Sequence, residues 1–310
     1  MSPPGAWPEL PSWNATRETL HRWTQVVGKV RLALTPWTNH SWHVPLYVTP
    51  VGLTTGPVPH GARLFQIDLD FREHRLSVVA ERETRHAALR AQSVAAFAAE
   101  VLATLDALGL GVEIHGAPNE LPDATPFLDD HDHASYDRAA VEAFASALRH
   151  AHRVLTRFRA PFTGKASPVH FFWGSFDLAV SRFSGAAAPQ HPGGIPNLPD
   201  WITREAYSHE VSSAGFWPGD ADTPPLFYSY AVPQPGGFAE APVEPAAARF
   251  DTALGEFVLP YAAVRSAPDP DAALLSFLET TYAAAAVGDA WHGLEAPAPA
   301  PARPRRLRPR

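Results

Sequence analysis

Residues 65–71 read Phe65-Gln66-Ile67-Asp68-Leu69-Asp70-Phe71, and their apolar and polar side chains alternate strictly. Successive side chains of a β-strand point to opposite faces, so this run predicts a strand with one buried face and one solvated face. Half-buried strands of this kind are typical of antiparallel sheets. The run therefore predicts an antiparallel sheet in the first half of the chain.

Further strands and four helices surround this run. Segments rich in aromatic and β-branched residues, with Gly or Pro at their borders, predict strands, and these are 42–49, 76–80, 169–183, 226–232 and 256–261, with an alternating strand at 30–34. Apolar residues at helical spacing predict helices over residues 14–27, 93–108, 137–158 and 271–286. Ser93, Asp137 and Asp269 precede the last three helices and are expected to cap them.

The order of these elements occurs twice along the chain. In each half a helix is followed by Gly-Lys, then by strands, then by a second helix, and the run 42–56 aligns without a gap on 171–185. We interpret this as an internal duplication. The expected fold is α+β, with two related α-β-β-β-α halves whose antiparallel sheets pack together or join into one sheet. The halves are residues 13–125 and 126–295.

Two segments have no place in the repeated order. Residues 186–225 are rich in Pro and Gly and are expected to form a long excursion over the surface or over a site in the second half. Residues 296–310 contain Ala, Pro and five arginines, which is typical of a disordered tail. Because that tail holds five of the 25 basic residues while the net charge is −7, the folded body is strongly acidic. We therefore expect no nucleic-acid binding by the body.

Composition excludes several classes of protein. The chain has 310 residues and no cysteine, which excludes disulfides, thiolate nucleophiles and cysteine-ligated metal. It has neither an apolar run long enough to cross a membrane nor a signal-peptide core, so we expect a cytoplasmic protein without a membrane partner. The motifs of serine hydrolases, zincins, dinucleotide enzymes and P-loop NTPases are also missing.

Polar residues in the strand segment 169–183 predict a site in the second half. His170, Asp177 and the nearby Lys165 are the candidate catalytic groups, with Arg182 as an anion clamp and Trp173 as a wall. Imidazole, carboxylate and amine are the groups of acid–base and covalent lysine chemistry. The alternative is a structural ion pair of Asp177 with Arg182 or Lys165. For Lys29, the second of the two lysines in the chain, we expect a structural role at a helix–strand junction.

Residues 206–219 form a second polar stretch. His209 is a further candidate catalytic base, and the segment also supplies candidate substrate-binding residues, namely Tyr207, Glu210 and Trp217, joined by Tyr228 and Tyr230 on a later strand. A surface loop that packs on Trp217 is equally consistent with this stretch. A metal-dependent variant of the site would use His131, His133 or His209, although acidic residues beside the first two are also expected before a helix.

The segment Gly164–Gly185 reads GKASPVHFFWGSFDLAVSRFSG and resembles a family of bacterial proteins of unknown function. The similarity extends from about residue 13 to 295 and includes 133–137, 206–219 and 256–261. This resemblance implies no activity or cofactor. From the residues alone we expect an enzyme acting on a small organic substrate by acid–base or lysine-assisted chemistry in an aromatic-lined pocket. The alternative is a non-catalytic small-molecule binder. Cofactor and oligomeric state stay open.

Overall fold

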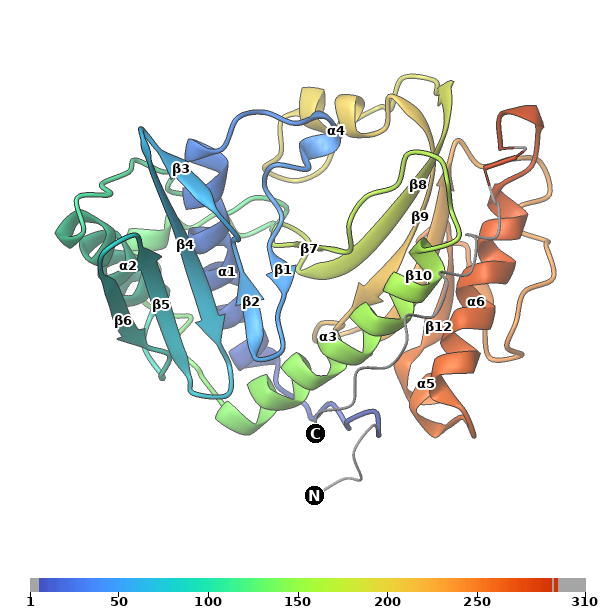
Figure 1. Ribbon diagram of the computed structural model, residues 1–310. Coiled ribbons are helices and arrows are strands. Elements are labelled where there is room, and N and C mark those ends of the chain that lie inside the picture. Colours follow the sequence, from blue (N-terminus) through green and yellow to red (C-terminus); the bar gives the residue numbers. More distant parts are fainter. Residues whose placement is uncertain (1–5, 292, 295–310) are drawn as a thin grey trace, which may run out of the picture.

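The computed structural model describes residues 6–291 and 293–294, so the predicted tail at 296–310 lies outside the described residues. The first half forms one helix, a six-stranded sheet and a second helix (Figure 1). Its elements are α1 (Asn14–Leu34), β1 (Tyr47–Val48), β2 (Gly52–Thr54), β3 (Val58–His60), β4 (Arg63–Asp70), β5 (Arg75–Ala80), β6 (Thr84–Ala88) and α2 (Val94–Ala107). The sheet order is β1-β2-β4-β5-β6, and β3 pairs with β4.

The second half contains a second six-stranded sheet, in the order β11-β12-β10-β9-β8-β7. Its elements are α3 (Arg138–Arg159), β7 (His170–Phe172), β8 (Asp177–Ala187), α4 (Asp200–Ala206), β9 (His209–Trp217), β10 (Leu226–Val232), β11 (Arg249–Asp251), β12 (Glu256–Pro260), α5 (Tyr261–Ser266) and α6 (Pro270–Ala285). Every strand pair in both sheets is antiparallel. The predicted α+β class is therefore confirmed, with more strands in each half than the three expected.

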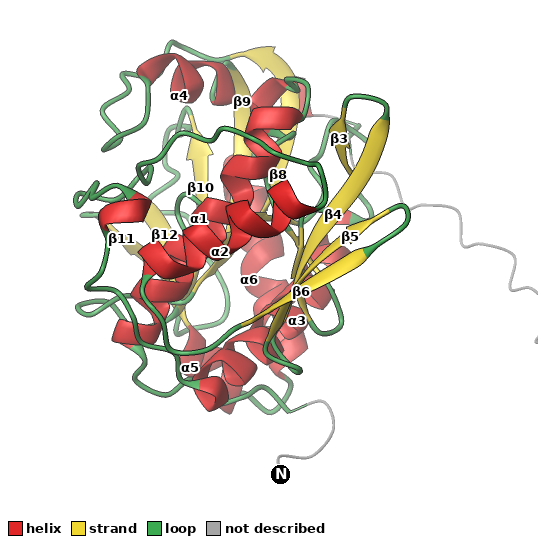
Figure 2. Ribbon diagram, turned by 90° about the vertical axis from the view of Figure 1, so that its left-hand side faces the viewer, coloured by secondary structure: helices red, strands yellow, loops and turns green. Residues whose placement is uncertain are grey.

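Helices cover one face of each sheet. In two views at right angles, α1 and α2 lie together on one side of the first sheet (Figures 1 and 2). In the second half, α3 and α6 pack against β8, β9 and β10. The helix α4 and the loop before it lie beyond one end of the second sheet (Figure 1). None of the helices in the described ranges combines the length and apolarity needed to cross a bilayer.

The local signals for the helix starts are confirmed. Ser93, Asp137 and Asp269 each accept a hydrogen bond from the backbone N–H three residues on, as N-cap side chains do. The alternating strand 65–71 is also confirmed as β4, where Phe65, Ile67 and Leu69 are buried. These features were predictable because they depend on neighbouring residues alone.

The strand predicted at 30–34 is wrong, because α1 continues to Leu34. The residues Leu20, Trp23, Val27 and Val30 keep helical spacing and are all fully buried, so the helical face extends through the segment that also alternates. The helix has a glycine at residue 28 because the indole of Trp173 lies against the backbone there. A Cβ on residue 28 would stand 2.3 Å from that ring. Lys29 consequently lies within a helix rather than at a helix–strand junction.

The single strand predicted at 169–183 is also wrong. The segment is a hairpin in which β7 and β8 pair, with His170 opposite Ala179 and Phe172 opposite Asp177. The chain reverses over residues 173–176, where Phe176 adopts a φ of 60°. Residues opposite one another share a face, so His170, Phe172 and Asp177 share one face and Arg182 lies on the other. A single strand over 169–183 would have put His170 and Arg182 on the same face.

The predicted excursion at 186–225 is shorter than expected. Residues 209–217 form β9, which lies inside the sheet between β8 and β10. The sequence did not predict this strand because its apolar and polar residues do not alternate. Residues 211–215 read Val-Ser-Ser-Ala-Gly, and almost the whole strand is buried. The stretch outside the sheet is the loop after β8 together with α4.

The two sheets meet edge to edge. Leu46, just before β1, and Phe171 of β7 form an antiparallel bridge, with backbone N–H to C=O distances of 2.9 and 2.8 Å. We call this bridge the seam; in Figure 1 β1 and β7 lie side by side. Both halves run helix, sheet, helix, but the gapless alignment of 42–56 on 171–185 would set β1 against the turn that precedes β8. The duplication stays a prediction.

Candidate functional site

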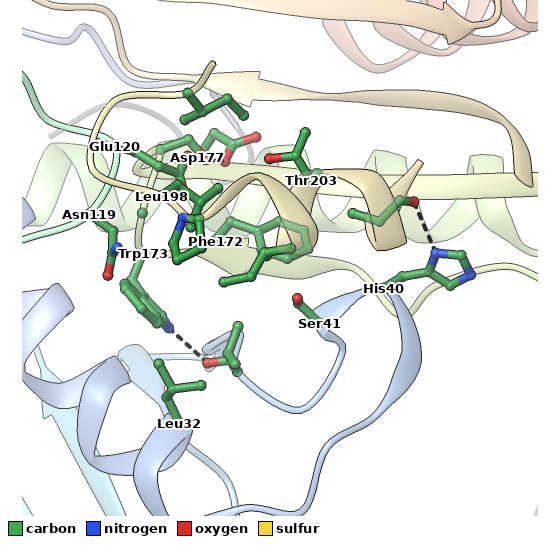
Figure 3. A pocket seen from close by; sticks show the side chains of 18 of the residues that line it. Leu32, His40, Ser41, Asn119, Glu120, Phe172, Trp173, Asp177, Leu198 and Thr203 are labelled. Carbon is green, nitrogen blue, oxygen red and sulfur yellow. Dashed lines mark hydrogen bonds between the residues drawn. The ribbon is translucent and has the colours of Figure 1, made fainter. Parts of the chain in front are cut away.

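A cavity of about 850 Å³ lies beside the seam and takes its walls from both halves. The first half contributes residues of α1, of the 37–44 loop and of the 115–124 loop. The second half contributes the β7–β8 hairpin, residues 195–207 and the adjacent faces of β9 and β10. Figure 3 shows many of these side chains converging on one space. The size is that of a pocket for a small organic molecule.

Aromatic rings form much of the wall. Trp42, Phe172, Trp173 and Phe183 all line the cavity, and the Trp173 indole is fixed by a 2.9 Å hydrogen bond from Nε1 to the Val44 carbonyl. Such rigid rings bind flat apolar groups with little loss of side-chain entropy.

The rim of the cavity is apolar as well. Leu32 and Trp37 line the cavity while 36% and 46% of their surface is exposed, and Trp201, 56% exposed, contacts Trp37 with ring centroids 5.2 Å apart. Exposed apolar side chains gathered at one place mark a binding surface more often than scattered ones do. The mouth is therefore suited to a ligand whose apolar part extends outward.

Asp177 carries the first carboxyl group of the site. It begins β8, directly after the hairpin turn, and its side chain is buried. Its Oδ1 accepts a 2.5 Å hydrogen bond from the Ser175 hydroxyl and its Oδ2 accepts one from the Tyr228 hydroxyl. Burial raises the pKa of Asp177, and the two hydroxyl donors oppose that rise. The group is thus held in a fixed orientation at the cavity wall.

Three tyrosines surround this carboxyl group. The hydroxyls of Tyr207 and Tyr230 lie 2.9 Å apart and are hydrogen-bonded to each other. Burial raises the pKa of Tyr207 and of Tyr228 well above the ordinary value. All three rings line the cavity. Tyr228 donates its proton to Asp177 and one of Tyr207 and Tyr230 donates to the other, so the hydroxyls can accept hydrogen bonds from a ligand and one of the Tyr207–Tyr230 pair keeps a proton to donate.

Glu120 carries the second carboxyl group. It lies in the 115–124 loop, and its backbone N–H donates to the Pro196 carbonyl at 2.9 Å. Burial raises the pKa of Glu120 to about 7; the neighbouring charge of Asp177 raises it further and Lys29 lowers it. Figure 3 shows Glu120 and Asp177 at the same end of the cavity. A carboxyl group with a pKa near 7 can both give and take a proton at neutral pH.

Lys29 is the cation of the cavity end that holds Glu120. It comes from α1 and is buried; its Nζ donates a hydrogen bond to Oδ1 of Asn119 and lies 5.6 Å from the ring centre of Trp173. Burial lowers the pKa of Lys29 to about 8, and the charge of Glu120 opposes this. Lys29 therefore lies in the cavity wall, inside α1 rather than at the helix–strand junction where it was expected.

Five of the predicted site residues line this cavity and six do not. Those that line it are Trp173, Asp177, Tyr207, Tyr228 and Tyr230. Those outside its lining are His170, Lys165, His209, Arg182, Glu210 and Trp217. The expectation that the imidazole of His170, the carboxylate of Asp177 and the ammonium of Lys165 gather in one hollow is therefore not met.

His170 and Arg182 are held in packed surroundings. The His170 side chain has no exposed surface and contacts the rings of Trp42, Tyr47 and Phe172. Arg182 faces the helices, where its guanidinium lies 3.6 Å from the ring centre of Phe158. The hairpin reversal explains the position of Arg182, which it puts on the face opposite Asp177. His170 shares the face of Asp177, but the surrounding rings cover it.

Lys165, His209 and Glu210 lie near the far ends of β8 and β9. Lys165 is exposed, and its Nζ lies 2.7 Å from Nε2 of His40. His209 is also exposed, and its Nδ1 is hydrogen-bonded to the Ser208 hydroxyl at 3.0 Å. Glu210 accepts a 2.8 Å hydrogen bond from the Ser184 hydroxyl. His209 and Glu210 therefore make contacts within the second half, whereas Lys165 contacts His40 of the first half.

Trp217 and the predicted metal ligands have local roles too. Trp217 packs against a small apolar cluster that includes Tyr228, on the same face of the second sheet as the cavity, but Trp217 itself does not line the cavity. His133 contacts Asp130 at 2.9 Å, and Asp130 in turn pairs with Arg22. Within residues 6–291 and 293–294, no three His, Asp or Glu side chains come together as a metal would require. The metal-dependent alternative has no cluster to support it in that range.

Sequence reasoning missed Glu120 and underrated Lys29. The rarity of lysine among 25 basic residues was a usable signal for Lys29. Glu120 gave no signal, because it lies in a loop of the first half and reaches the site through a contact with Pro196 of the second half.

Gly174→Ala is expected to displace the Glu120 carboxyl group. A Cβ at residue 174 would stand 1.9 Å from Oε1 of Glu120, and because this oxygen is the end of a flexible side chain, Glu120 should move rather than the backbone. We expect a loss of about 1 kcal/mol or less in the free energy of unfolding and a shift of the Glu120 pKa toward its ordinary value. An NMR titration of labelled glutamate carboxyl carbons would measure this.

The matched control is Gly116→Ala, because no atom lies within 4 Å of a Cβ placed there. An unchanged Glu120 titration in Gly174→Ala would contradict the close contact between the two residues.

Fold and site together define an α+β protein with an aromatic cavity at the junction of two antiparallel sheets, with two carboxyl groups and a lysine in its wall. The chain belongs to a family of unknown function (DUF5996), whose model matches residues 7–296. This confirms the resemblance. Comparisons with curated proteins and with solved structures found no match.

Proposed function

We propose that the protein is an enzyme that acts on a small, largely apolar organic molecule by acid–base chemistry in this cavity. The observation that supports it best is the placement of two carboxyl groups, of Glu120 and Asp177, in one aromatic-lined space. Polar groups in apolar surroundings are costly unless they have partners, so an acidic pair kept in such a wall fits a role in handling a substrate.

The two carboxyl groups have different roles in the proposal. Asp177 accepts hydrogen bonds from Ser175 and Tyr228, which hold its carboxyl group in one orientation. In the proposal this fixed carboxyl group orients the substrate. No hydrogen bond to the Glu120 side chain comes from another described residue, so its oxygens are available to a substrate. Glu120 is therefore the proton-transferring group, and its pKa of about 7 suits that task.

The charge balance supports a small-molecule substrate over a nucleic acid. The chain has 32 acidic residues and 25 basic ones. Among the residues that line the cavity, two carry carboxyl groups and one is a lysine. A cavity of this kind would repel phosphates rather than neutralise them. A cytoplasmic location and a bacterial source remain predictions of the sequence and the resemblance.

Binding by the cavity can be tested with the neutral apolar dye N-phenyl-1-naphthylamine. We expect its fluorescence to rise with the wild-type protein and this rise to be lost in Ala117→Trp, because Ala117 lines the cavity and an indole there would fill it. Ala253→Trp, in an exposed loop outside the cavity lining, is the matched control. Equal dye binding by Ala117→Trp and the wild type would show that the dye does not occupy the cavity.

The same dye separates an enzyme from a binder. Compounds of a small-molecule collection that displace it are then incubated with the protein and analysed by mass spectrometry. The enzyme is supported if the wild type converts such a compound, while Glu120→Gln still binds it, as shown by dye displacement, but converts it about a hundredfold or more slowly. Compounds that displace the dye but emerge unchanged from both proteins support the non-catalytic binder, which the extensive apolar wall favours as the alternative.

A further inference from the structure

Of the two lysines of the chain, one lines the cavity and the other lies beside residues of its wall. All other basic residues among the 25 are arginines. Lys29 lines the cavity, and the Nζ of Lys165 lies 5.2 Å from the ring centres of Trp42 and of Phe183, which line it as well. Arginine carries the same charge but stays protonated in proteins, whereas lysine can lose its proton and act as a nucleophile. A chain that otherwise uses arginine thus supplies amines at this place.

Of the two, Lys29 has the surroundings of a reactive amine. Its side chain is buried while Lys165 is exposed. Its Nζ bonds a neutral amide oxygen, Oδ1 of Asn119, and within the described part of the chain no carboxylate forms an ion pair with it. An amine held by a neutral acceptor in apolar surroundings gives up its proton more easily than an ion-paired one.

Glu120 supplies the acid that such an amine needs. Glu120 and Lys29 line the same cavity, and each changes the other's pKa. With pKa values of about 7 for Glu120 and about 8 for Lys29, a fraction of the carboxyl group is protonated and a fraction of the amine is neutral between pH 7 and 8. The Trp173 ring lies beside the amine, with its centre 5.6 Å from the Nζ of Lys29.

We propose that Lys29 forms an imine with an aldehyde or ketone substrate bound in the cavity, with Glu120 as the proton donor and acceptor. This rests on the proposed function and names its substrate class. The Nζ lone pair attacks the carbonyl carbon, and a proton moves from nitrogen to oxygen to give a carbinolamine. Glu120 then protonates the hydroxyl group, the C–O bond breaks, and water leaves as the C=N bond forms. Hydrolysis returns the amine, so no oxidant or reductant is consumed.

The apolar rim narrows the substrate class further. Leu32 and Trp37 extend from the lining to the surface, and Trp201 contacts Trp37. A carbonyl compound with a flat apolar substituent would place its carbonyl carbon at Lys29 and the substituent along the aromatic walls.

Trapping by reduction tests the proposal. The protein is incubated with trans-cinnamaldehyde and sodium cyanoborohydride, and the labelled peptides are mapped by mass spectrometry. With only two lysines and the α-amino group available, the sites of labelling are easily separated. We expect Lys29 to be labelled several-fold faster than Lys165 at pH 7.5, because burial lowers the pKa of both amines and lowers that of Lys29 further, to about 8, which raises its neutral fraction.

Three variants test whether the fast labelling depends on Lys29 and Glu120. Lys29→Arg should lose the fast labelling, Lys165→Arg should keep it, and Glu120→Gln should slow it while circular dichroism stays unchanged. Labelling of Lys29 no faster than Lys165, or fast labelling retained in Lys29→Arg, would overturn the imine. If cinnamaldehyde displaces N-phenyl-1-naphthylamine but leaves no adduct on Lys29, the imine fails and the proposed acid–base function stands. If neither the dye nor the aldehyde binds, both fail.

Discussion

His170→Phe is expected to make the protein more resistant to acid than the wild type. The His170 ring is fully buried among aromatic rings, and neither Nδ1 nor Nε2 has a hydrogen-bond partner among the described residues. Burial, together with the charges of Arg31 and Arg159, lowers the pKa of His170 to about 3. A neutral phenyl ring of similar shape would keep the packing and remove the unpaired nitrogens.

The sign of the pH effect follows from proton linkage. An unfolded histidine has a pKa of 6.5, so between pH 6.5 and 3 the unfolded chain binds a proton that the folded chain does not. The free energy of unfolding therefore falls as the pH drops through this range. The variant lacks this proton, and between pH 7 and pH 5 it should gain about 2 kcal/mol relative to the wild type.

Urea unfolding at both pH values measures this difference. At pH 7 we expect His170→Phe to be equal to the wild type or more stable by about 1–3 kcal/mol, because a buried unsatisfied polar group is lost. The exposed His131→Phe is the matched control and should leave the pH dependence unchanged. His21, whose pKa burial lowers to about 3, keeps its own contribution in all three proteins. Identical pH dependence in His170→Phe and the wild type would contradict the buried neutral imidazole.

Glu120→Gln is expected to change the pH dependence in the opposite direction. The pKa of Glu120 rises from 4.5 to about 7 in the folded protein, so between these values the folded chain binds more protons than the unfolded chain. The wild type should then lose stability as the pH rises from 4.5 to 7. Glutamine does not titrate, so from pH 4.5 to 7 the free energy of unfolding of the variant should rise by about 2 kcal/mol relative to that of the wild type. This figure allows for the partial exposure of the Glu120 side chain.

Two features of the design keep this test specific. Glu113→Gln, at an exposed position just before the 115–124 loop, is the matched control. Glu256, whose pKa is also raised to about 7, remains in both variants, so the slope should decrease without vanishing. If Glu120→Gln follows the wild type from pH 4.5 to 7, Glu120 is not buried beside Asp177 as described.

The parts of the fold that were predictable depend on short stretches of sequence. Capping by Asp137 or alternation around Ile67 needs no knowledge of distant residues. The hairpin at 169–183 could not be predicted, because periodicity does not distinguish one strand from two when the turn residues, such as Phe176, are aromatic. That one reversal changed the face of Arg182 relative to His170.

The candidate site was predictable on the second-half side only. Asp177 lies on β8 and Tyr228 and Tyr230 lie on β10, with only β9 between these strands, so a register argument can bring them together. Glu120 and Lys29 come from the first half, and their approach depends on how the two sheets meet. Alternation and spacing carry no information on such long-range contacts.

The seam between Leu46 and Phe171 has a thermodynamic consequence. A cavity built from both halves lets a single bound molecule contact both, so ligand binding would raise the stability of one half only together with that of the other. Calorimetry of the saturated protein should then show one cooperative heat-absorption peak even if the two halves melt separately in its absence. Occupancy would then add to the buried core that the two halves share in making the two sheets a single melting unit.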